Sequence, residues 1–183
     1  MKIDLELSQY PADRDSVITI GVFDGMHRGH RHLIARLVRQ ARTTGRQAGV
    51  ITFRNHPLSI LKTDFKHAYI TEFEERVRII TSLGADFVIP ITFDLDLSDM
   101  SPKKFVARLQ KHLNMRELVV GPDFAMGHNR VGDVISLTTL GTEMEFSVHV
   151  VPLFLEEGEA IRSTSVRKAI SSGDVNQTAN LLD

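Results

Sequence analysis

A series of short apolar runs, separated by amphipathic stretches, most constrains how this chain folds. The runs cover residues 16–21, 48–53, 86–92, 117–121 and 145–152 and are rich in β-branched residues. Continuous apolar runs of this length are typical of parallel strands that are covered on both faces. Strands that alternate with helices favour right-handed crossovers, so the sequence predicts an α/β fold with an open parallel sheet and helices on both faces.

Three of the intervening stretches carry helix signals. An apolar stripe predicts a helix that begins near His30; the stripe is formed by Leu33, Ile34, Leu37, Val38 and Ala41. Thr71 and Glu74 have the spacing of a capping box and predict a helix through about residue 83. Ser101 followed by Pro102 predicts the start of a third helix, with apolar residues at 105, 109 and 113 on one face.

Composition excludes several classes of function. The 183 residues fit one domain spanning 1–183, the formal net charge is −1, and there is no cysteine. This charge gives no support to a nucleic-acid coat or a membrane-surface role, and the absence of cysteine excludes disulfides, thiolate zinc sites and cysteine nucleophiles. Residues 1–15 are too acidic for a signal peptide and no apolar run is long enough to span a membrane, so we expect a cytoplasmic protein without nucleic-acid or membrane partners. The arginines between residues 28 and 46 are interpreted as a solvated helix face.

The stretch GVFDGMHRGH, residues 21–30, follows the first apolar run and combines backbone freedom with two imidazoles. Gly21, Gly25 and Gly29 permit a close approach of the backbone to a ligand. The helix that follows turns free N–H groups and its positive dipole end toward the loop. His27 and His30 lie on about the same side of a first helical turn, so the loop is suited to a polyanion such as a triphosphate.

Two other interpretations of this loop stay open. A structural turn with surface histidines would need no ligand. A metal site could use His27, His30 and His32, although no carboxylate or thiol completes a zinc motif. The loop matches neither the dinucleotide fingerprint G-x-G-x-x-G nor a P-loop.

Two further stretches contain candidate ligand-binding groups. In IRSTSVRKAI, residues 161–170, Ser163, Thr164 and Arg167 surround the predicted start of a helix and are suited to phosphate oxygens. The alternative is that Ser163 is a simple N-cap and Arg167 is solvated. The glycine-rich stretch at 119–133 is either a flexible connector or a ligand cover.

These motifs resemble those of a known family. G-x-F-D-x-x-H-x-G-H is similar to the signature of the HxGH nucleotidyltransferase superfamily, and Ile161, Ser163, Thr164 and Arg167 match its partner motif, with Arg162 where serine is usual. The loop at 119–133 resembles that of prokaryotic FAD synthetases, with matches at Gly121, Asp123, Phe124, Gly127, Gly132 and Asp133. Segments at 51–57 and 93–106 agree in the same order. Over residues 16–183 the chain resembles the FMN adenylyltransferase module of prokaryotic bifunctional FAD synthetase.

The resemblance implies a Rossmann-like nucleotidyltransferase fold and the reaction ATP + FMN → FAD + pyrophosphate. It implies His27, His30 and Arg167 as catalytic residues. The implied ATP-binding residues are Gly21, Phe23, Asp24, Gly25, His27, Gly29, His30, Ser163, Thr164 and Arg167, and the implied flavin-binding residues are Asp123, Phe124, Met126 and Gly127. Mg²⁺ is expected to enter with ATP, without direct side-chain ligands. Asn55 and His56 are further candidates, with a loop-fixing role as the alternative.

Several questions stay open at this stage. Arg162 either contacts phosphate or points into solvent. Residues 172–183 resemble the linker before a riboflavin kinase domain, so we expect that domain to be absent and a separate kinase to supply FMN; a natural single-domain protein and an excised module both fit. The alternatives to FMN adenylyltransferase are an HxGH enzyme for pantetheine phosphate, nicotinamide mononucleotide or a polyol phosphate, and a non-catalytic flavin or nucleotide sensor. Ala125 and Arg162, which depart from the family motifs, are the features that admit the sensor.

Overall fold

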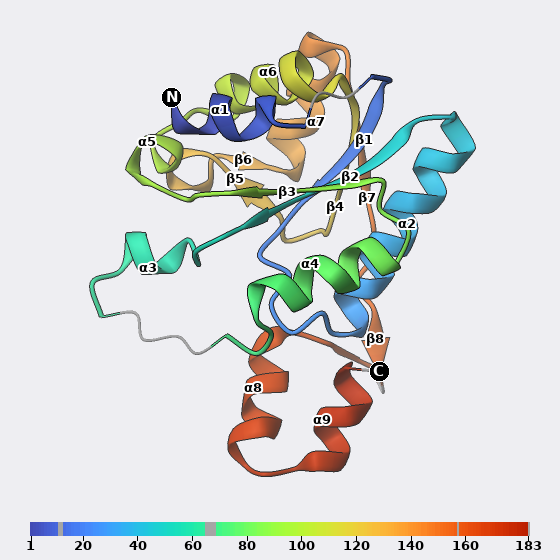
Figure 1. The fold of residues 1–183 in the computed structure, drawn as a ribbon, viewed down its shortest axis with the longest axis vertical. Coiled ribbons are helices and arrows are strands. Elements are labelled where there is room, and N and C mark those ends of the chain that lie inside the picture. The colour runs from blue at the N-terminus through green and yellow to red at the C-terminus, as the bar shows by residue number, and fades with distance from the viewer. Residues whose placement is uncertain (11–12, 65–68, 157, 183) are drawn as a thin grey trace.

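The computed structural model describes residues 1–10, 13–64, 69–156 and 158–182. Five parallel strands form the central sheet in the order β3-β2-β1-β4-β7 (Figure 1). They are β1 (Ser16–Ile20), β2 (Gln47–Phe53), β3 (Phe87–Ile91), β4 (Met115–Val120) and β7 (Ser147–Val150). The predicted open parallel sheet is therefore confirmed, and the order reverses beside β1, where ligands of such sheets bind.

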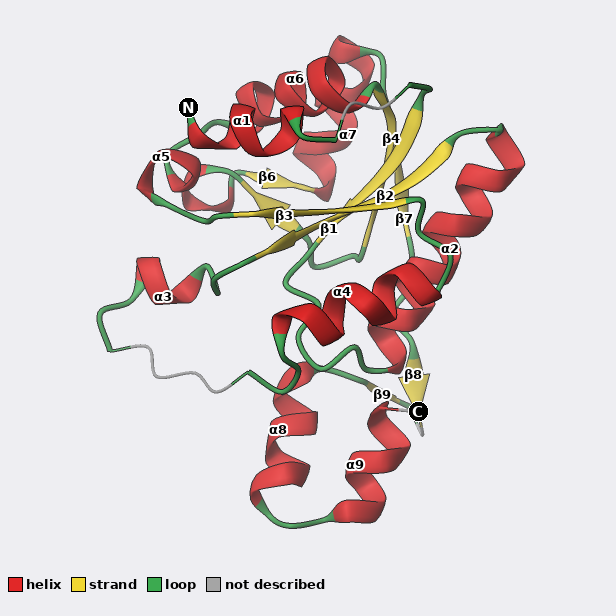
Figure 2. Ribbon diagram, in the orientation of Figure 1, coloured by secondary structure: helices red, strands yellow, loops and turns green. Residues whose placement is uncertain are grey.

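Helices cover both faces of the sheet, because neighbouring strand residues point to opposite faces (Figure 2). Ile18 is buried under the layer that contains α1 (Lys2–Ser8), α6 (Pro102–Leu113) and α7 (Val134–Met144). Val17 is buried on the other side, under α2 (Arg28–Thr44) and α4 (Phe73–Ser82). Two apolar cores therefore hold the sheet rigidly between helices.

The helix starts agree with the sequence only in part. Ser101 caps α6 as predicted, since its Oγ accepts a hydrogen bond from the Lys104 amide at 3.4 Å. The helix expected near His30 begins two residues earlier, at Arg28, with His27 as its N-cap. The capping box predicted at Thr71 was wrong, although the predicted helix is present. Glu72 is the N-cap of α4 and makes no side-chain cap, and the Thr71 amide donates to the Asp24 carboxylate.

Smaller elements complete the chain. Two short helices follow β2 and β3, namely α3 (Leu58–Leu61) and α5 (Leu95–Ser98). Two hairpins, β5 (Ala125–Met126) with β6 (Gly132–Asp133) and β8 (Leu155–Glu156) with β9 (Glu159–Ala160), follow β4 and β7, and η1 (His128–Arg130) lies within the first hairpin. The last two helices, α8 (Ser163–Ser171) and α9 (Val175–Leu182), form a hairpin beyond the carboxyl ends of the strands (Figures 1 and 2).

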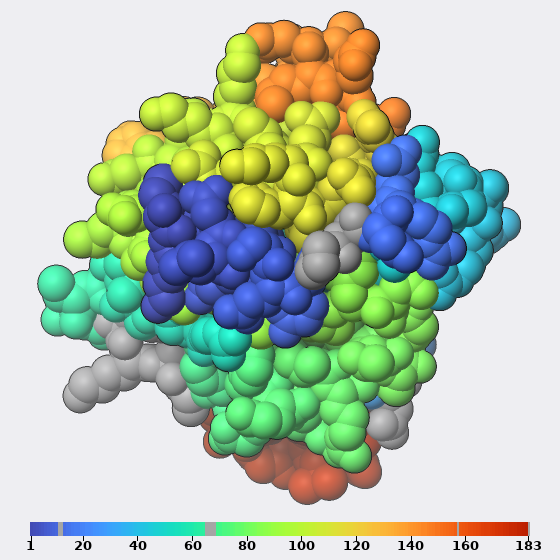
Figure 3. Space-filling model, turned by 45° about the horizontal axis from the view of Figure 1, so that its top comes forward, coloured from blue at the N-terminus to red at the C-terminus, as the bar shows by residue number. Residues whose placement is uncertain are grey.

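Helix α1 was not predicted and packs beside α6, as the blue and yellow-green surfaces in Figure 3 show. The Glu6 carboxylate fixes it to the sheet by accepting from the Thr92 amide at 3.0 Å and the Thr92 hydroxyl at 2.7 Å. No helix within the described residues is long and apolar enough to cross a membrane.

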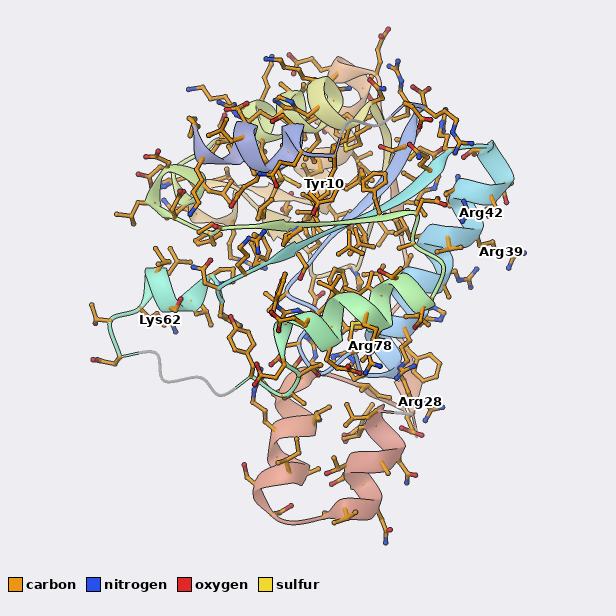
Figure 4. All side chains as sticks on the ribbon, viewed as in Figure 1. Tyr10, Arg28, Arg39, Arg42, Lys62 and Arg78 are labelled. Atoms are coloured by element: carbon orange, nitrogen blue, oxygen red, sulfur yellow. The ribbon has the colours of Figure 1, made fainter. Side chains whose placement is uncertain are left out.

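The arginines of α2 do not form a uniformly solvated face. Arg42 pairs with Asp86 at 2.7 Å, and Arg46 pairs with the buried Glu117. Arg39 and Arg42 point away from the sheet near the far end of α2 (Figure 4). The predicted solvated face is therefore correct only in part, because neighbouring carboxylates neutralise several of these charges.

Candidate nucleotide-binding site

A cavity of about 290 Å³ lies at the carboxyl ends of β1, β4 and β7. Its walls come from the loop after β1, the start of α2, the loop after β4, and the segments that flank the β8–β9 hairpin. Of the residues implied for ATP or flavin, it is lined by Gly21, Phe23, His27, Gly29, His30, Asp123, Phe124 and Ser163. The structure thus brings together groups from three distant parts of the sequence at the switch point of the sheet.

The two histidines of the loop are stacked on each other. The ring centroids of His27 and His30 lie 3.7 Å apart with an angle of 21° between the planes, and the Phe23 ring meets His30 edge-on at 5.3 Å. His27 is buried and His30 is partly exposed toward the cavity that both line. The Nδ1 atoms of both rings are buried and have no hydrogen-bond partner among the described residues.

Burial keeps both imidazoles neutral. Desolvation lowers the pKa of His27 to about 4, opposed by the negative charge of Asp24 and assisted by Arg167. Desolvation also holds the pKa of His30 well below 6.5, with smaller contributions from His27 and Arg76. At neutral pH each ring is therefore an uncharged group with one N–H to donate to an anion.

The backbone of this loop is strained. Phe23 and Met26 have positive φ angles of 54° and 41°, which non-glycine residues adopt at a cost, and both side chains are buried. Gly29 is required for close approach, because a Cβ there would lie 3.2 Å from the Ile161 carbonyl oxygen. The loop is thus held against the segment that carries the second phosphate motif.

Asp24 lies behind the cavity and binds both motifs. Its carboxylate accepts from the amides of Ile70 at 2.9 Å and Thr71 at 3.2 Å and also receives the guanidinium of Arg167. Its carbonyl oxygen accepts from the Ser163 hydroxyl at 3.0 Å. Neither Asp24 nor Arg167 lines the cavity. The geometry therefore gives Asp24 a positioning role rather than a direct place in the cavity.

A second connection crosses the mouth of the cavity. The Arg162 guanidinium pairs with the Asp123 carboxylate at 2.8 Å, and both side chains are more than half exposed. The sequence did not predict this contact, and a contact of Arg162 with phosphate stays a prediction. Thr164, in contrast, is exposed on α8 and lies outside the cavity lining.

Comparison with known proteins now assigns the family. The family model described as FAD synthetase matches residues 9–165. The chain belongs to the FAD synthetase family. The resemblance that the sequence motifs indicated is therefore confirmed.

Curated members of the FAD synthetase family are similar to nearly the whole chain. The bifunctional riboflavin kinase/FMN adenylyltransferase of Escherichia coli (strain K12) is 36% identical over 177 residues, which cover 96% of this chain and 56% of that protein. The corresponding Listeria monocytogenes protein is 30% identical over 171 residues, covering 93% and 54%. The chain therefore spans little more than half the length of these relatives.

A solved structure shares the fold. The crystal structure of a macrolide-efflux protein from Streptococcus pneumoniae matches with a TM-score of 0.86 at 27% identity and covers 96% of this chain and 57% of that one.

The loop after β4, which the FAD synthetase resemblance assigns to flavin, only partly reaches the cavity. Phe124 lines it, but Met126 and Gly127 do not; Met126 packs against the core under α6. A Cβ on Gly127 or Gly132 would lie 2.7 Å from the Pro102 ring, so the β5–β6 hairpin is pressed onto the start of α6. Met126 and Gly127 thus pack against the core and α6, and they do not line the cavity as Phe124 does.

The apolar end of the cavity was missed from the sequence. It is formed by His32, Leu33, Val151, Pro152, Leu153 and Phe154. The Phe154 ring lies 5.6 Å from that of His32 and 5.0 Å from the Arg28 guanidinium. Residues 151–154 could have been predicted from their position directly after β7, because ligands of such sheets bind at the carboxyl ends of the strands.

Asn55 and His56 fix their own loop. The Asn55 side chain exchanges two hydrogen bonds with the backbone of Phe93, at 2.8 and 2.9 Å, and His56 Nδ1 accepts from the Leu58 amide at 3.1 Å. These contacts favour the loop-fixing interpretation. The metal interpretation of the histidines has no support, since the described part of the chain contains no group of three or more His, Asp or Glu side chains that could hold a metal.

Proposed function

We propose that this chain transfers AMP from ATP to FMN. An oxygen of the FMN phosphate forms a bond to the α-phosphorus of ATP, the bond to the bridging oxygen breaks, and FAD and pyrophosphate are released. Membership of the FAD synthetase family supports the reaction. The observation that carries the proposal is the stacked pair of neutral histidines at the N-terminus of α2, facing a cavity at the switch point of the sheet.

The triphosphate is proposed to lie along the start of α2. His27 and His30 donate N–H groups, and the free amides of the first helical turn add positive potential. Ser163 adds a hydroxyl at the cavity wall. Arg167 and Asp24 hold this wall in place, and Arg167 is also proposed to approach the leaving pyrophosphate.

The adenine ring is proposed to occupy the apolar end of the cavity. Pro152, Leu153 and Phe154 contribute apolar side chains to the lining there. Aromatic and proline side chains pack well on a planar base. The triphosphate then extends from this end toward the histidines.

The flavin is proposed to enter on the side of Asp123 and Phe124. Both line the cavity and follow β4, the strand that pairs with β7. The Phe124 ring provides an apolar contact for the isoalloxazine, while Met126 and Gly127 support it from the core side. In this proposal the two substrates contact different segments of the cavity lining, and their phosphates meet near the histidines.

The chemistry needs positioning and charge stabilisation rather than a general base. A phosphate monoester has a second pKa near 6, so the FMN phosphate is already largely a dianion at neutral pH. The work of the site is to align two polyanions and to stabilise the charge that develops on pyrophosphate. Neutral imidazoles and helix amides can do this without proton transfer.

The cation is proposed to be Mg²⁺ that arrives with ATP. Mg²⁺ keeps several waters and commonly binds through substrate phosphates. The only carboxylate that lines the described cavity, Asp123, already pairs with Arg162. The donor set thus suits a cation carried by the nucleotide better than one held by the protein.

FMN is proposed to come from a riboflavin kinase. The curated relatives are bifunctional and carry that activity in their names. A kinase that phosphorylates the ribityl 5′-hydroxyl of riboflavin supplies the phosphate that the transfer requires. Nucleic acid is not expected to bind, because carboxylates pair with several of the arginines of α2.

The proposal is tested by measuring which phosphate-bearing acceptor supports the release of pyrophosphate from ATP. Pyrophosphate release from ATP and Mg²⁺ is measured with FMN, nicotinamide mononucleotide, phosphopantetheine or glycerol 3-phosphate as the second substrate. Release that requires FMN supports the proposal. Release with another acceptor would identify a different HxGH nucleotidyltransferase, and flavin binding without any release would identify a sensor.

A further inference from the structure

Arg76 is a buried arginine outside the sequence motifs. It lies on α4 with 1% of its surface exposed. Its guanidinium is 5.4 Å from the centres of both the Tyr69 and Phe73 rings, and its Nη2 donates to the Phe53 carbonyl oxygen at 2.9 Å. Since Phe53 ends β2, Arg76 lies beside the carboxyl edge of the sheet where the site is built.

The hydrogen bonds and charge of Arg76 are poorly compensated. Its Nε and Nη1 atoms are buried without a hydrogen-bond partner, and no carboxylate among the described residues lies within 4 Å. A guanidinium does not lose its proton in a protein, so the charge persists despite burial. Burying such a charge is costly, and an apolar side chain of similar size would pack between the two rings at lower cost.

Negative groups among the described residues compensate the charge of Arg76 only at a distance. The carboxylates of Asp24 and Glu74 stabilise the guanidinium at longer range; Glu74 is exposed, and Asp24 is the partner of Arg167. His27 and His30 are neutral at pH 7. Among the described residues behind the cavity, the buried carboxylate of Asp24 therefore interacts with two guanidinium groups, that of the buried Arg76 and that of Arg167, whose side chain is 28% exposed.

The field of Arg76 reaches the site through His30. Its positive charge is among the causes that keep the pKa of His30 low. His30 lines the cavity, whereas Arg76 does not. A charge in this position acts on an anion in the cavity without touching it, and low-dielectric surroundings extend its range.

We propose that Arg76 is a positioning residue whose buried charge acts through the neutral histidine pair and draws the phosphates of ATP to the start of α2. This inference rests on the proposed ATP site. In this arrangement His27 and His30 donate hydrogen bonds to the phosphates, and the buried Arg76 supplies the positive charge. The ligand class is a polyphosphate, and an uncharged ligand would be insensitive to Arg76.

The test compares three variants of the whole chain. Arg76→Met removes the charge and fills the space between the rings. Arg76→Lys keeps a cation in the same place. Arg78→Met is the matched control, because Arg78 lies on the same helix with its side chain 76% exposed and pairs with Glu75 (Figure 4). The dissociation constant of ATP is measured directly by calorimetry, and the His30 titration is followed by NMR.

Arg76→Met is expected to weaken ATP binding by about tenfold and to raise the pKa of His30, while Arg78→Met changes neither. Arg76→Lys is expected to restore ATP binding at pH 6.5 and to lose this restoration as the pH rises, because a buried lysine gives up its proton more readily than arginine. All affinities are compared with the unaltered chain at the same pH.

A purely structural role predicts another pattern. The thermal midpoint would fall, but ATP affinity and the His30 titration of the folded fraction would be unchanged, and this would overturn the inference. If Arg76→Met does not fold, the Arg76→Lys variant decides. The inference would be overturned if the ATP affinity of Arg76→Lys equals that of the unaltered chain at every pH. Because binding is measured without FMN, failure to form FAD would contradict the proposed function and leave this test intact.

Discussion

The carboxylate of Asp24 receives the guanidinium of Arg167, which lies 143 positions further along the chain. Asp24 belongs to the loop after β1 and Arg167 to helix α8. Ser163 reinforces the connection by donating to the Asp24 carbonyl oxygen at 3.0 Å. The two phosphate motifs are therefore one structural unit, and Asp24 joins them.

Removing one partner of this pair should destabilise the fold. Asp24→Asn should lower the free energy of unfolding by about 3 kcal/mol, because it leaves the Arg167 charge without its buried partner. Arg167→Met should cost a similar amount, and the double variant clearly less than the sum of the two. Urea denaturation measures all three, with exposed Asp96→Asn as the control. Additive effects would show that the two residues do not interact.

His30 should contribute to turnover more than to folding. His30→Ala should lower kcat by at least about tenfold, because it removes a donor aimed at developing charge. His112→Gln, on α6 and far from the cavity, is the control. Steady-state FAD formation and a thermal melt are measured on the same samples. Unchanged turnover in His30→Ala would remove this residue from the site.

The pKa of His27 predicts how stability depends on pH. Folding lowers this pKa from 6.5 to about 4, so the unfolded chain binds a proton in this window while the folded chain does not. The stabilisation is therefore complete above about pH 6.5 and is lost as the pH falls toward 4, by about 3 kcal/mol in total. His30 shifts in the same direction and adds to the loss.

Urea denaturation between pH 7.5 and 4.5 checks this expectation. His27→Gln should flatten the dependence relative to the unaltered chain. The carboxylates with lowered pKa values, such as Asp86, lose their contribution only below their ordinary value of 3.8, outside this window. A profile of His27→Gln that parallels the unaltered chain would contradict the assignment.

Substitutions of Phe124 and Phe154, which line different parts of the cavity, should affect the KM values of different substrates. Phe124→Ala should raise the KM for FMN roughly three- to tenfold with a smaller effect on ATP, since it removes an aromatic contact. Phe154→Ala should show the reverse preference. Initial rates with each substrate varied in turn measure both variants. Equal effects of Phe124→Ala on the two substrates would argue against the flavin side.

Replacing Arg162 should raise the KM for ATP but hardly change the free energy of unfolding. Because its pair with Asp123 is exposed, Arg162→Ser should change the free energy of unfolding by less than about 1 kcal/mol. The KM for ATP should rise roughly two- to fivefold if Arg162 exchanges Asp123 for phosphate. Asp123→Asn, which frees the guanidinium, should not raise it. An unchanged KM for ATP in Arg162→Ser would contradict a contact of Arg162 with phosphate.

The sequence predicted the features that depend on local pattern. The continuous apolar run that contains Val17 and Ile18 indicates a strand covered on both faces, and the structure buries both residues. Ser101 acts as the predicted cap because its partner, the Lys104 amide, is three residues away. The histidine loop was found because its glycines and imidazoles are contiguous.

Features that depend on distant contacts were missed or misplaced. Helix α1 is short and is held by α6 and by Thr92, so its own sequence carries little signal. Thr71 lies one position before Glu72, the N-cap of α4, and its amide donates to Asp24, 47 positions away, a contact that local pattern does not reveal. Arg76 resembles an ordinary solvated arginine until the packing of Tyr69 and Phe73 encloses it.

The most direct test of the central claim is to incubate the chain with ATP, Mg²⁺ and FMN and to separate the flavins by chromatography, with riboflavin in place of FMN in a parallel sample. The account predicts FAD from FMN, because the FMN phosphate is the group that attacks ATP. Absence of FAD from FMN, in a sample shown to be folded and to bind ATP, would contradict it.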